Sequence, residues 1–245
     1  MIERPLLALE LSQRQGGVAV IDADGVEHVR MVAGGRRDRD DFLPAIDSVC
    51  SAAGIRPRDL KSVAVDLGPG GFTGLRVSIA AAQAIAEAAG ATVVGVPAAD
   101  VAITSTLAAE ASELVGEVAV IAATRNGSGW QSHFTRGASS SNWRIKGVPG
   151  LQESPTTDVD GVLADDHLME NWRTAFEDAG IPVIEPRFDP AALARLALEA
   201  TSTSERTDVV VASDPATLRP IYPRVPEAVR LWRVTRGGPH LGHYQ

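Results

Sequence analysis

The sequence contains a single cysteine, Cys50, among its 245 residues. One thiol cannot form a disulfide within the chain, and a metal site built from several cysteines is excluded for the same reason. Cys50 lies in an apolar pattern with helical spacing, so we interpret it as a small residue of the core.

Long apolar runs are also absent. A membrane-spanning helix needs about 18 consecutive apolar residues, whereas the alanine-rich stretch after Gly74 is interrupted by Arg76, Gln83 and Glu87. Residues 1–5 lack the basic and apolar regions of a secretory signal. We therefore expect a cytoplasmic protein that does not contact the membrane.

Basic residues are fewer than acidic ones, with 23 Lys and Arg against 31 Asp and Glu and a net charge of −8. Tight binding to nucleic acid depends on clustered Lys and Arg that neutralise phosphates. The composition therefore disfavours a chain that binds nucleic acid by itself, although a partner could supply the basic surface. Because 44% of the residues are apolar, the chain can form a sizeable globular core.

Signatures of metalloenzymes and serine hydrolases are missing. The five histidines include no pair with the spacing H-x-x-x-H, and we interpret His240 and His243 as part of a frayed tail. The segment Gly127-Ser128-Gly129 lies in a predicted hairpin, not between a strand and a helix, so it is not a nucleophile elbow.

Two acidic pairs could in principle serve acid–base chemistry or bind magnesium: Asp158 with Asp160, and Asp165 with Asp166. Both pairs fall in predicted loops or at a helix start, where acidic residues favour the helix dipole. We therefore interpret them as structural.

The most informative stretch runs from Asp66 to Arg76, between the apolar residues 63–65 and a predicted helix over 77–86. Its glycines are spaced one residue too widely for a dinucleotide fingerprint, and none precedes Lys-Ser or Lys-Thr. Glycine also permits close backbone packing and sharp turns. We therefore interpret the stretch as a tight strand-to-helix connection rather than a phosphate cradle. Its motif residues are Gly68, Pro69, Gly70, Gly71, Thr73 and Arg76.

The helix that follows has two apolar flanks at 100° per residue. One flank predicts contact with the sheet and consists of Leu75, Ile79, Ala82 and Ala86. The other is made of smaller residues that allow a second helix to approach closely: Val77, Ala81, Ala84 and Ala88. Burial of the whole helix within its own domain is the alternative. We favour a subunit interface, because a two-layer lobe has nothing else to cover the outer flank.

The predicted elements describe an α/β protein with a mixed sheet and packed helices in each half. In the first half we expect strands at 6–9, 17–21, 26–29, 63–65 and 92–96, and helices at 40–53 and 77–86. In the second half we expect strands at 117–123, 130–134, 159–163 and 183–184, a helix at 167–179 and another that begins at the N-cap Asp189. The polar segment 137–141 is expected to be a loop tip. The predicted division is an N-terminal lobe with the partner-binding helices at 1–100, a smaller lobe at 101–190, and a C-terminal helix that packs back, with an irregular tail, at 190–245. The boundary between the lobes is expected near residues 97–110.

Three segments carry a resemblance to a known family: Leu7 to Ser12, Asp66 to Arg76, and Pro220 to Arg224. Through them the chain resembles, over nearly its full length, the TsaB or YeaZ-like family of bacterial tRNA threonylcarbamoyladenosine biosynthesis proteins. The resemblance implies a Gcp-like domain and two similar lobes of the actin-like ATPase, or ribonuclease H-like, type.

The same resemblance implies a function without catalysis. Members of the family pair with a catalytic paralogue, TsaD, which adds threonylcarbamoyl to adenosine 37 of tRNAs that read ANN codons, and a TsaE-like ATPase is a further member of the complex. We expect no cofactor, although a nucleotide at the subunit interface stays open, and at most indirect contact with tRNA. Whether the isolated chain forms a homodimer stays open. The expected partner interface comprises Phe42, Ile46, Gly74, Val77, Ala81, Ala84 and Ala88.

The chain departs from the family pattern at three places. The family usually has Asp-Thr-Ser at Glu10-Leu11-Ser12, Ser at Gly71, and Asp-Ala-Arg at Ala122-Ala123-Thr124. The first and third changes remove or displace carboxylates where active relatives handle a nucleotide and its metal. The alternative function is an actin-like small-molecule kinase or ATPase with Glu10, Ser12 and Asp66 near phosphates or metal in the cleft between lobes, and these departures argue against it.

Overall fold

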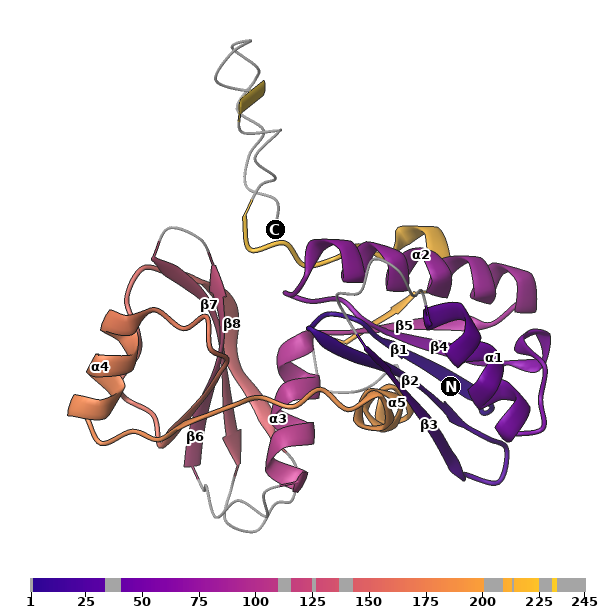
Figure 1. Ribbon diagram of the computed structural model, residues 1–245, viewed down its shortest axis with the longest axis horizontal. Coiled ribbons are helices and arrows are strands. Elements are labelled where there is room, and N and C mark those ends of the chain that lie inside the picture. The colour runs from indigo at the N-terminus through magenta and orange to yellow at the C-terminus, as the bar shows by residue number, and fades with distance from the viewer. Residues whose placement is uncertain are drawn as a thin grey trace.

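The computed structural model describes residues 2–33, 41–109, 116–124, 127–136, 143–200, 209–212, 214–224 and 231–232. Within these residues the chain forms two mixed sheets, which lie side by side as two lobes with helices packed on them (Figure 1). The predicted fold class is confirmed. His240, His243 and the predicted loop tip at 137–141 lie outside the described residues.

The first sheet has the strand order β11-β5-β4-β1-β2-β3 among the described residues. β1, β4 and β5 are parallel to one another, while β2, β3 and β11 run antiparallel to their neighbours. The strands are β1 (Leu6–Glu10), β2 (Gln15–Ile21), β3 (Glu27–Ala33), β4 (Ser62–Asp66), β5 (Thr92–Val96) and β11 (Val210–Ala212).

The second sheet, in the order β10-β9-β6-β7-β8, repeats this topology. β6, β7 and β8 form an antiparallel meander as β1, β2 and β3 do, and β9 and β10 add in parallel beside β6. The strands are β6 (Gly116–Thr124), β7 (Ser128–Arg136), β8 (Arg144–Gln152), β9 (Gly161–Ala164) and β10 (Val183–Ile184). The two lobes are therefore similar in topology although their sequences show no repeat.

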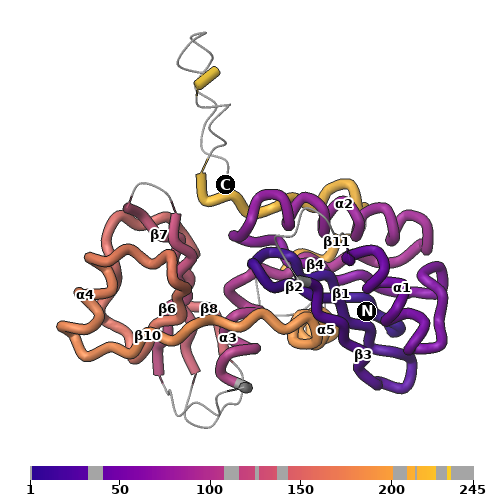
Figure 2. The backbone as a smooth tube through the Cα atoms, in the orientation of Figure 1, coloured from indigo at the N-terminus to yellow at the C-terminus, as the bar shows by residue number. Residues whose placement is uncertain are grey.

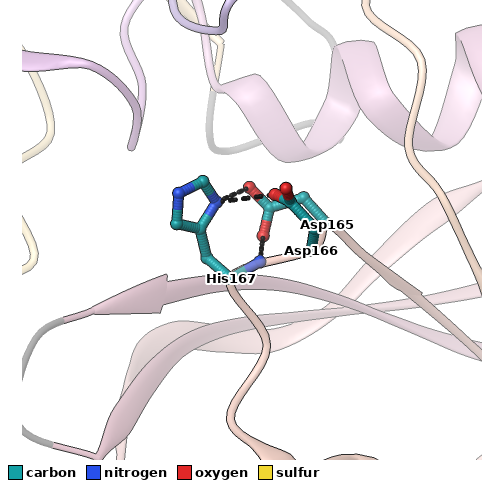
Figure 3. Close-up of side chains that lie close together, drawn as sticks. All are labelled: Asp165, Asp166 and His167. Carbon is teal, nitrogen blue, oxygen red and sulfur yellow. Dashed lines mark hydrogen bonds and ion pairs between the residues drawn. The ribbon is translucent and has the colours of Figure 1, made fainter.

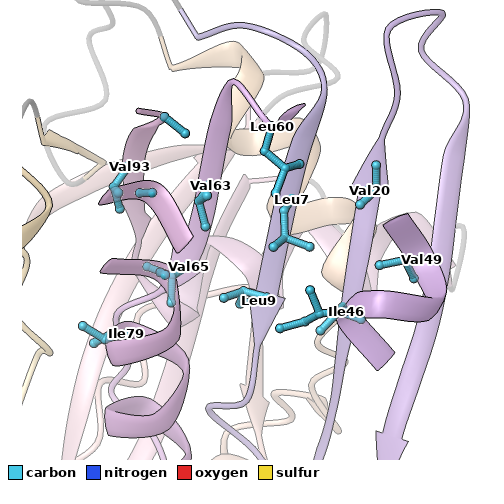
Figure 4. Packing of buried hydrophobic residues seen from close by; sticks show 14 of the residues in the cluster. Leu7, Leu9, Val20, Ile46, Val49, Leu60, Val63, Val65, Ile79 and Val93 are labelled. Atoms are coloured by element: carbon cyan, nitrogen blue, oxygen red, sulfur yellow. The ribbon is translucent and has the colours of Figure 1, made fainter. Parts of the chain in front are cut away.

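The central strands β1 and β4 of the first sheet are buried on both faces. Their side chains alternate between the two faces. Leu7 and Leu9 point toward α1 (Phe42–Ala52) and α2 (Phe72–Ala89), in the cluster shown in Figure 4. Leu6 and Ala8 instead join a cluster with α5 (Pro190–Glu199) on the opposite face. The nearly continuous apolar sequence of β1 is the pattern expected of a central strand covered twice.

Two helices are exchanged between the lobes. α3 (Ala98–Ala109) follows the first sheet, yet Ala102 and Ile103 pack on β6 and β9 of the second. α5 follows the second sheet, yet it packs on β1 and β2; Figure 2 shows the chain returning to the first lobe before α5. Backbone N–H groups before α5 donate to α3, from Arg187 to Thr106 Oγ1 at 2.8 Å and from Asp189 to Ser105 Oγ at 3.0 Å. This exchange makes α3 and α5 the junction between the lobes.

The other face of the second sheet is covered by α4 (Glu170–Asp178), which buries Trp172 and Phe176. Short 3-10 helices lie at Pro57–Asp59 and Pro215–Thr217. None of the helices in the described part of the chain combines the length and apolar character needed to cross a membrane. Cys50 lies on the buried side of α1, and burial raises the pKa of its thiol to about 11, as suits a core residue.

Two predictions need correction, and the strands β8 and β11 were not predicted. α2 begins at Phe72, five residues before Val77, because Gly74 lies inside the helix and not in the loop. Residues 98–109, expected to be a boundary, are the helix α3. The strand β8 had no counterpart in the prediction, because its glycines and Pro149 interrupt any alternation.

Candidate functional site

The connection from β4 to α2 is packed against the chain that leaves β1. The Gly71 N–H donates to the Ser12 carbonyl oxygen at 2.6 Å. A Cβ atom at Gly70 would lie 2.3 Å from that same oxygen, and one at Gly74 would lie 2.0 Å from the Leu11 carbonyl oxygen. Only glycine allows this approach. The start of α2 is therefore held against backbone.

The three residues proposed for a nucleotide site do come together. Glu10 ends β1 and Asp66 ends β4, next to it in the sheet, and both are fully buried with Ser12. The Glu10 Oε1 atom accepts bonds from the Ser12 N–H at 2.7 Å and the Ser12 hydroxyl at 2.6 Å. Asp66 Oδ1 accepts the Gly68 N–H at 2.5 Å.

The buried carboxyl groups of Glu10 and Asp66 disfavour the binding of an anion at this place. Burial first, and then the Glu10 carboxylate, raise the pKa of Asp66 well above its usual range. No lysine or arginine of the described residues hydrogen-bonds or ion-pairs with Glu10 or Asp66. A nucleotide phosphate here would face two buried acidic groups, so a cation would have to be supplied with it.

The outer flank of α2 is open to solvent. Val77 is 43% exposed, Ala84 and Ala88 are exposed, and Ala81 is partly buried. The opposite flank, predicted to cover the sheet, is buried and comprises Leu75, Ile79, Ala82 and Ala86. Within the described chain, α2 therefore presents an exposed face of small apolar side chains, which we call the α2 face: Val77, Ala80, Ala81, Ala84 and Ala88.

Three residues expected at the partner interface are not on this surface. Phe42 and Ile46 are each 4% exposed, because they belong to the face of α1 that covers the sheet. Gly74 is packed against Leu11 instead. The exposed apolar residue of α1 is Leu43, at 62%. The helical spacing identified the apolar side of α1, but it did not show that this side packs on the chain's own sheet and not on a partner.

Sequence reasoning missed features at both ends of the α2 face. At its C-terminal end lies an open hollow of about 460 Å³, lined by Arg56, Pro57, Arg58, Ala84, Ile85, Ala88 and Ala89. At its N-terminal end, the Arg76 guanidinium lies 3.7 Å above the Phe72 ring, and its Nε donates to the Tyr222 hydroxyl at 3.1 Å. The motif containing Tyr222 was recognised in the sequence, but its contact with the helix could not be.

One side-chain cluster in the described residues has the composition of a metal site: Asp165, Asp166 and His167 (Figure 3). His167 Nδ1 lies 2.9 Å from Asp165 Oδ2 and 3.0 Å from Asp166 Oδ1. Arg14, from the other lobe, places NH1 3.1 Å from Asp166 and NH2 2.9 Å from His167 Nε2. The Arg14 guanidinium therefore compensates the Asp166 carboxylate, a contact that the interpretation from the helix dipole did not include.

Asp160 belongs to a short chain of polar contacts near the start of β6. Asp160 accepts the Glu117 N–H at 2.7 Å, and Glu117 in turn lies 3.3 Å from His133. Ser128 lies in the hairpin between β6 and β7, where its hydroxyl meets Thr124 at 2.6 Å and Arg224 at 2.5 Å. None of the bonds that the structure gives Ser128 involves a histidine, so the arrangement is not a hydrolase triad.

Comparisons with known proteins agree with this fold. The family model of TsaD, tRNA N6-adenosine threonylcarbamoyltransferase, matches residues 34–128. A crystal structure from Pseudomonas aeruginosa, of an uncharacterized protein similar to the peptidase YeaZ, superposes with a TM-score of 0.67 at 20% identity, covering 89% of this chain and 99% of the other. YeaZ from the same organism gives a TM-score of 0.65 at 17% identity, covering 88% and 99%. No curated protein sequence matches the chain. The resemblance seen in the sequence is thereby confirmed, and the chain has the YeaZ fold.

Proposed function

We propose that this chain is the non-catalytic partner subunit of the complex that adds threonylcarbamoyl to adenosine 37 of tRNAs reading ANN codons. It pairs with a TsaD-like catalytic paralogue and activates it. A TsaE-like ATPase is a further member of the complex. The chain acts in the cytoplasm and needs no direct contact with tRNA.

The observation that carries this proposal is the α2 face. Its exposed alanines follow one another at helical spacing along nearly the whole helix. Small side chains allow the backbone of a second helix to approach closely, and a contiguous apolar surface of this kind is characteristic of protein contacts. The match to the TsaD model includes α2, so a paralogue of that family offers a related helix for pairing.

The buried carboxyl groups support a role without catalysis. Asp66 has its pKa raised, lies beside Glu10 and has no cationic side chain as a partner among the described residues. A kinase or ATPase must instead stabilise the phosphates of its nucleotide with cations or backbone N–H groups. The Gly71 N–H, at the start of α2, is already bonded to Ser12.

The test is to purify the full chain, mix it with the TsaD homologue of the same cell, and measure co-elution and the dissociation constant. Ala84→Arg places a long charged side chain at the centre of the α2 face and is expected to abolish pairing while the chain remains folded. Thr174→Arg, at an exposed position of α4 on the other lobe, is the matched control and should pair normally. ATP turnover by the isolated chain, or normal pairing of Ala84→Arg, would overturn the proposal.

A further inference from the structure

We propose that residues 214–224, which we call the strap, hold α2 in the position in which its exposed face can receive the partner. Gln83, Arg76 and Tyr222 are then positioning residues of the interface although they lie beside the α2 face. This inference rests on the proposed function for the identity of the partner. The anchoring itself can be measured on the chain alone.

The strap is bound along the side of α2 by directional contacts. The Gln83 amide donates to the Pro215 carbonyl oxygen at 2.9 Å and to the Leu218 carbonyl oxygen at 3.4 Å. Leu218 is buried in the same core as the inner flank of α2. The Ile221 N–H donates to the Leu67 carbonyl oxygen at 2.7 Å, just before the glycine connection. A segment far away in sequence therefore fixes both the helix and the loop that leads into it.

A second group of contacts fixes the first turns of α2. The Tyr222 ring lies 5.6 Å from the Phe72 ring, and its hydroxyl accepts the Arg76 Nε–H at 3.1 Å. Arg76 closes the group by stacking 3.7 Å above Phe72. Phe72 is 48% exposed. Without Tyr222, the side chains of Phe72 and Arg76 would lose the contact that limits their rotation in solvent.

The far end of the strap reaches the second lobe. The Arg224 guanidinium donates to the Ser128 hydroxyl at 2.5 Å, in the hairpin between β6 and β7. Figure 1 shows the chain following α2 from the short 3-10 helix toward that lobe. The strap is therefore anchored at its two ends and along its length, as expected of a segment that limits the movement of α2.

Pairing through alanines makes the position of α2 critical. Close helix packing depends on complementary surfaces, and small displacements lose contacts that larger side chains would restore. Two residues of the buried flank that holds α2 on the sheet, Ala82 and Ala86, are themselves alanines. Contacts at the side of the helix therefore contribute to its orientation, and ordering the surface before binding avoids part of the entropic cost of association.

The experiment compares Gln83→Ala and Tyr222→Ala with the wild-type full chain. Each variant should exchange the amide hydrogens of α2 at least about tenfold faster, and should pair with the TsaD homologue at least about tenfold more weakly, because both values report an extra opening of the helix. Tyr222→Phe keeps the ring on Phe72 and should recover most of both effects. Glu87→Gln, at an exposed position of α2, is the matched control and should change neither.

Hydrogen exchange tests whether the strap anchors α2, and the pairing measurement tests whether this anchoring matters for the proposed function. If the amide hydrogens of α2 exchange at the wild-type rate in Gln83→Ala and Tyr222→Ala, the strap does not anchor the helix. If they exchange faster but pairing with the TsaD homologue is unchanged, the strap has no role at the interface. If Tyr222→Ala does not fold, Gln83→Ala compared with the wild type gives the same test. If the wild-type chain itself does not pair, the proposed function fails, whereas the exchange rates still decide whether the strap holds α2.

Discussion

At the scale of single residues, Gly74 determines how closely α2 approaches the first hairpin. An alanine inside a helix normally stabilises it by about 1 kcal/mol relative to glycine. At Gly74 the added Cβ would lie 2.0 Å from the Leu11 carbonyl oxygen, which is backbone and cannot rotate away. We expect Gly74→Ala to lower the free energy of unfolding by about 1–3 kcal/mol, as overpacked sites do. Urea denaturation measures the change.

The control for this substitution lies three residues earlier. Gly71 is the N-cap of α2, and a Cβ there would lie 3.5 Å from Ser12 oxygen, an ordinary contact. Gly71→Ser should change stability by only a few tenths of a kcal/mol, because serine is slightly better than glycine at an N-cap. Equal losses in Gly71→Ser and Gly74→Ala would show that the loop does not tolerate side chains in general and that the contact with Leu11 is not the cause.

Asp66 should make the stability of the chain depend on pH. Its pKa is raised in the folded chain, mainly by burial, so the folded state keeps a proton that the unfolded state releases above about pH 4. This contribution is fully present below the pKa of the unfolded chain and is lost as pH rises toward the folded pKa. Asp66→Asn can still accept the Gly68 N–H and donate to Glu10. We expect it to be more stable than the wild type near neutral pH, with a smaller difference at pH 4, as measured by thermal unfolding.

Asp59 provides the control of opposite sign. Hydrogen bonds from Arg56 lower its pKa to about 2, so its contribution is present above about pH 4 and lost as pH falls through about 2. Asp59 is exposed to solvent, so Asp59→Asn should lower stability slightly at neutral pH or leave it unchanged. A gain at neutral pH in both variants, or in neither, would contradict the assignment to Asp66.

The residue types near these sites were readable from the sequence, but their contacts were not. The close packing of the glycine connection was predicted from the glycines alone, and the close approach of backbone to Gly70 and Gly74 agrees with it. The contact of Arg76 with Tyr222 joins residues 146 positions apart. No local pattern encodes such a pair, because it depends on how the C-terminal segment crosses the helix.

At the scale of elements, prediction succeeded where one side of a helix or strand is apolar. The two flanks of α2 were assigned correctly, since the buried flank repeats every three or four residues. α3 was missed because apolar residues surround it, so no single face stands out: it buries Ala99, Val101, Ala102 and Ile103. β8 was missed because Gly147, at a φ of 71°, and Pro149 interrupt its alternation. Tertiary contacts decide such elements.

The start of α5 gives a prediction at this scale. Asp189 Oδ1 accepts the Ala191 N–H at 2.9 Å, and Pro190 occupies the first turn, as the sequence predicted for an N-cap. Asp189→Ala should lower the free energy of unfolding by about 1 kcal/mol, because it leaves that N–H without its bond. The urea midpoint at unchanged slope measures the loss.

The control keeps the hydrogen-bond acceptor and removes only the charge. Asp189→Asn should retain most of the stability, since asparagine caps a helix about as well as aspartate. Asp189 also lies 3.5 Å from Arg195 NH2 in a solvent-exposed pair, which is expected to contribute little. An equal loss in both variants would assign the effect to that ion pair instead of the cap.

At the scale of the whole molecule, the sequence did not show which sheet α3 and α5 each cover. The order of strands indicates two mixed sheets, but it does not say which lobe a connecting helix covers. The structure places α5 on the strands that begin the chain, and α3 on the sheet that follows it. The division predicted from the sequence has the C-terminal helix packing back on the rest of the chain, without naming the sheet that it covers. Because α5 comes from the far end of the chain, the first lobe is not a continuous segment with a complete core.

The exchange makes a prediction about fragments, which also tests the boundaries proposed at residues 100 and 190. Residues 98–188 contain the second sheet with α4 on one face and α3 on the other, so this fragment should fold alone with a cooperative thermal transition. Residues 116–188 lack α3 and expose Val118, Val120 and Leu163, so they should aggregate or remain unfolded. Residues 1–100 lack α5, whose removal uncovers Leu6 and its neighbours, and should not fold either. Circular dichroism and size-exclusion chromatography distinguish these outcomes. Cooperative folding of 116–188 would mean that α3 belongs to the first lobe energetically, despite its position on the second sheet.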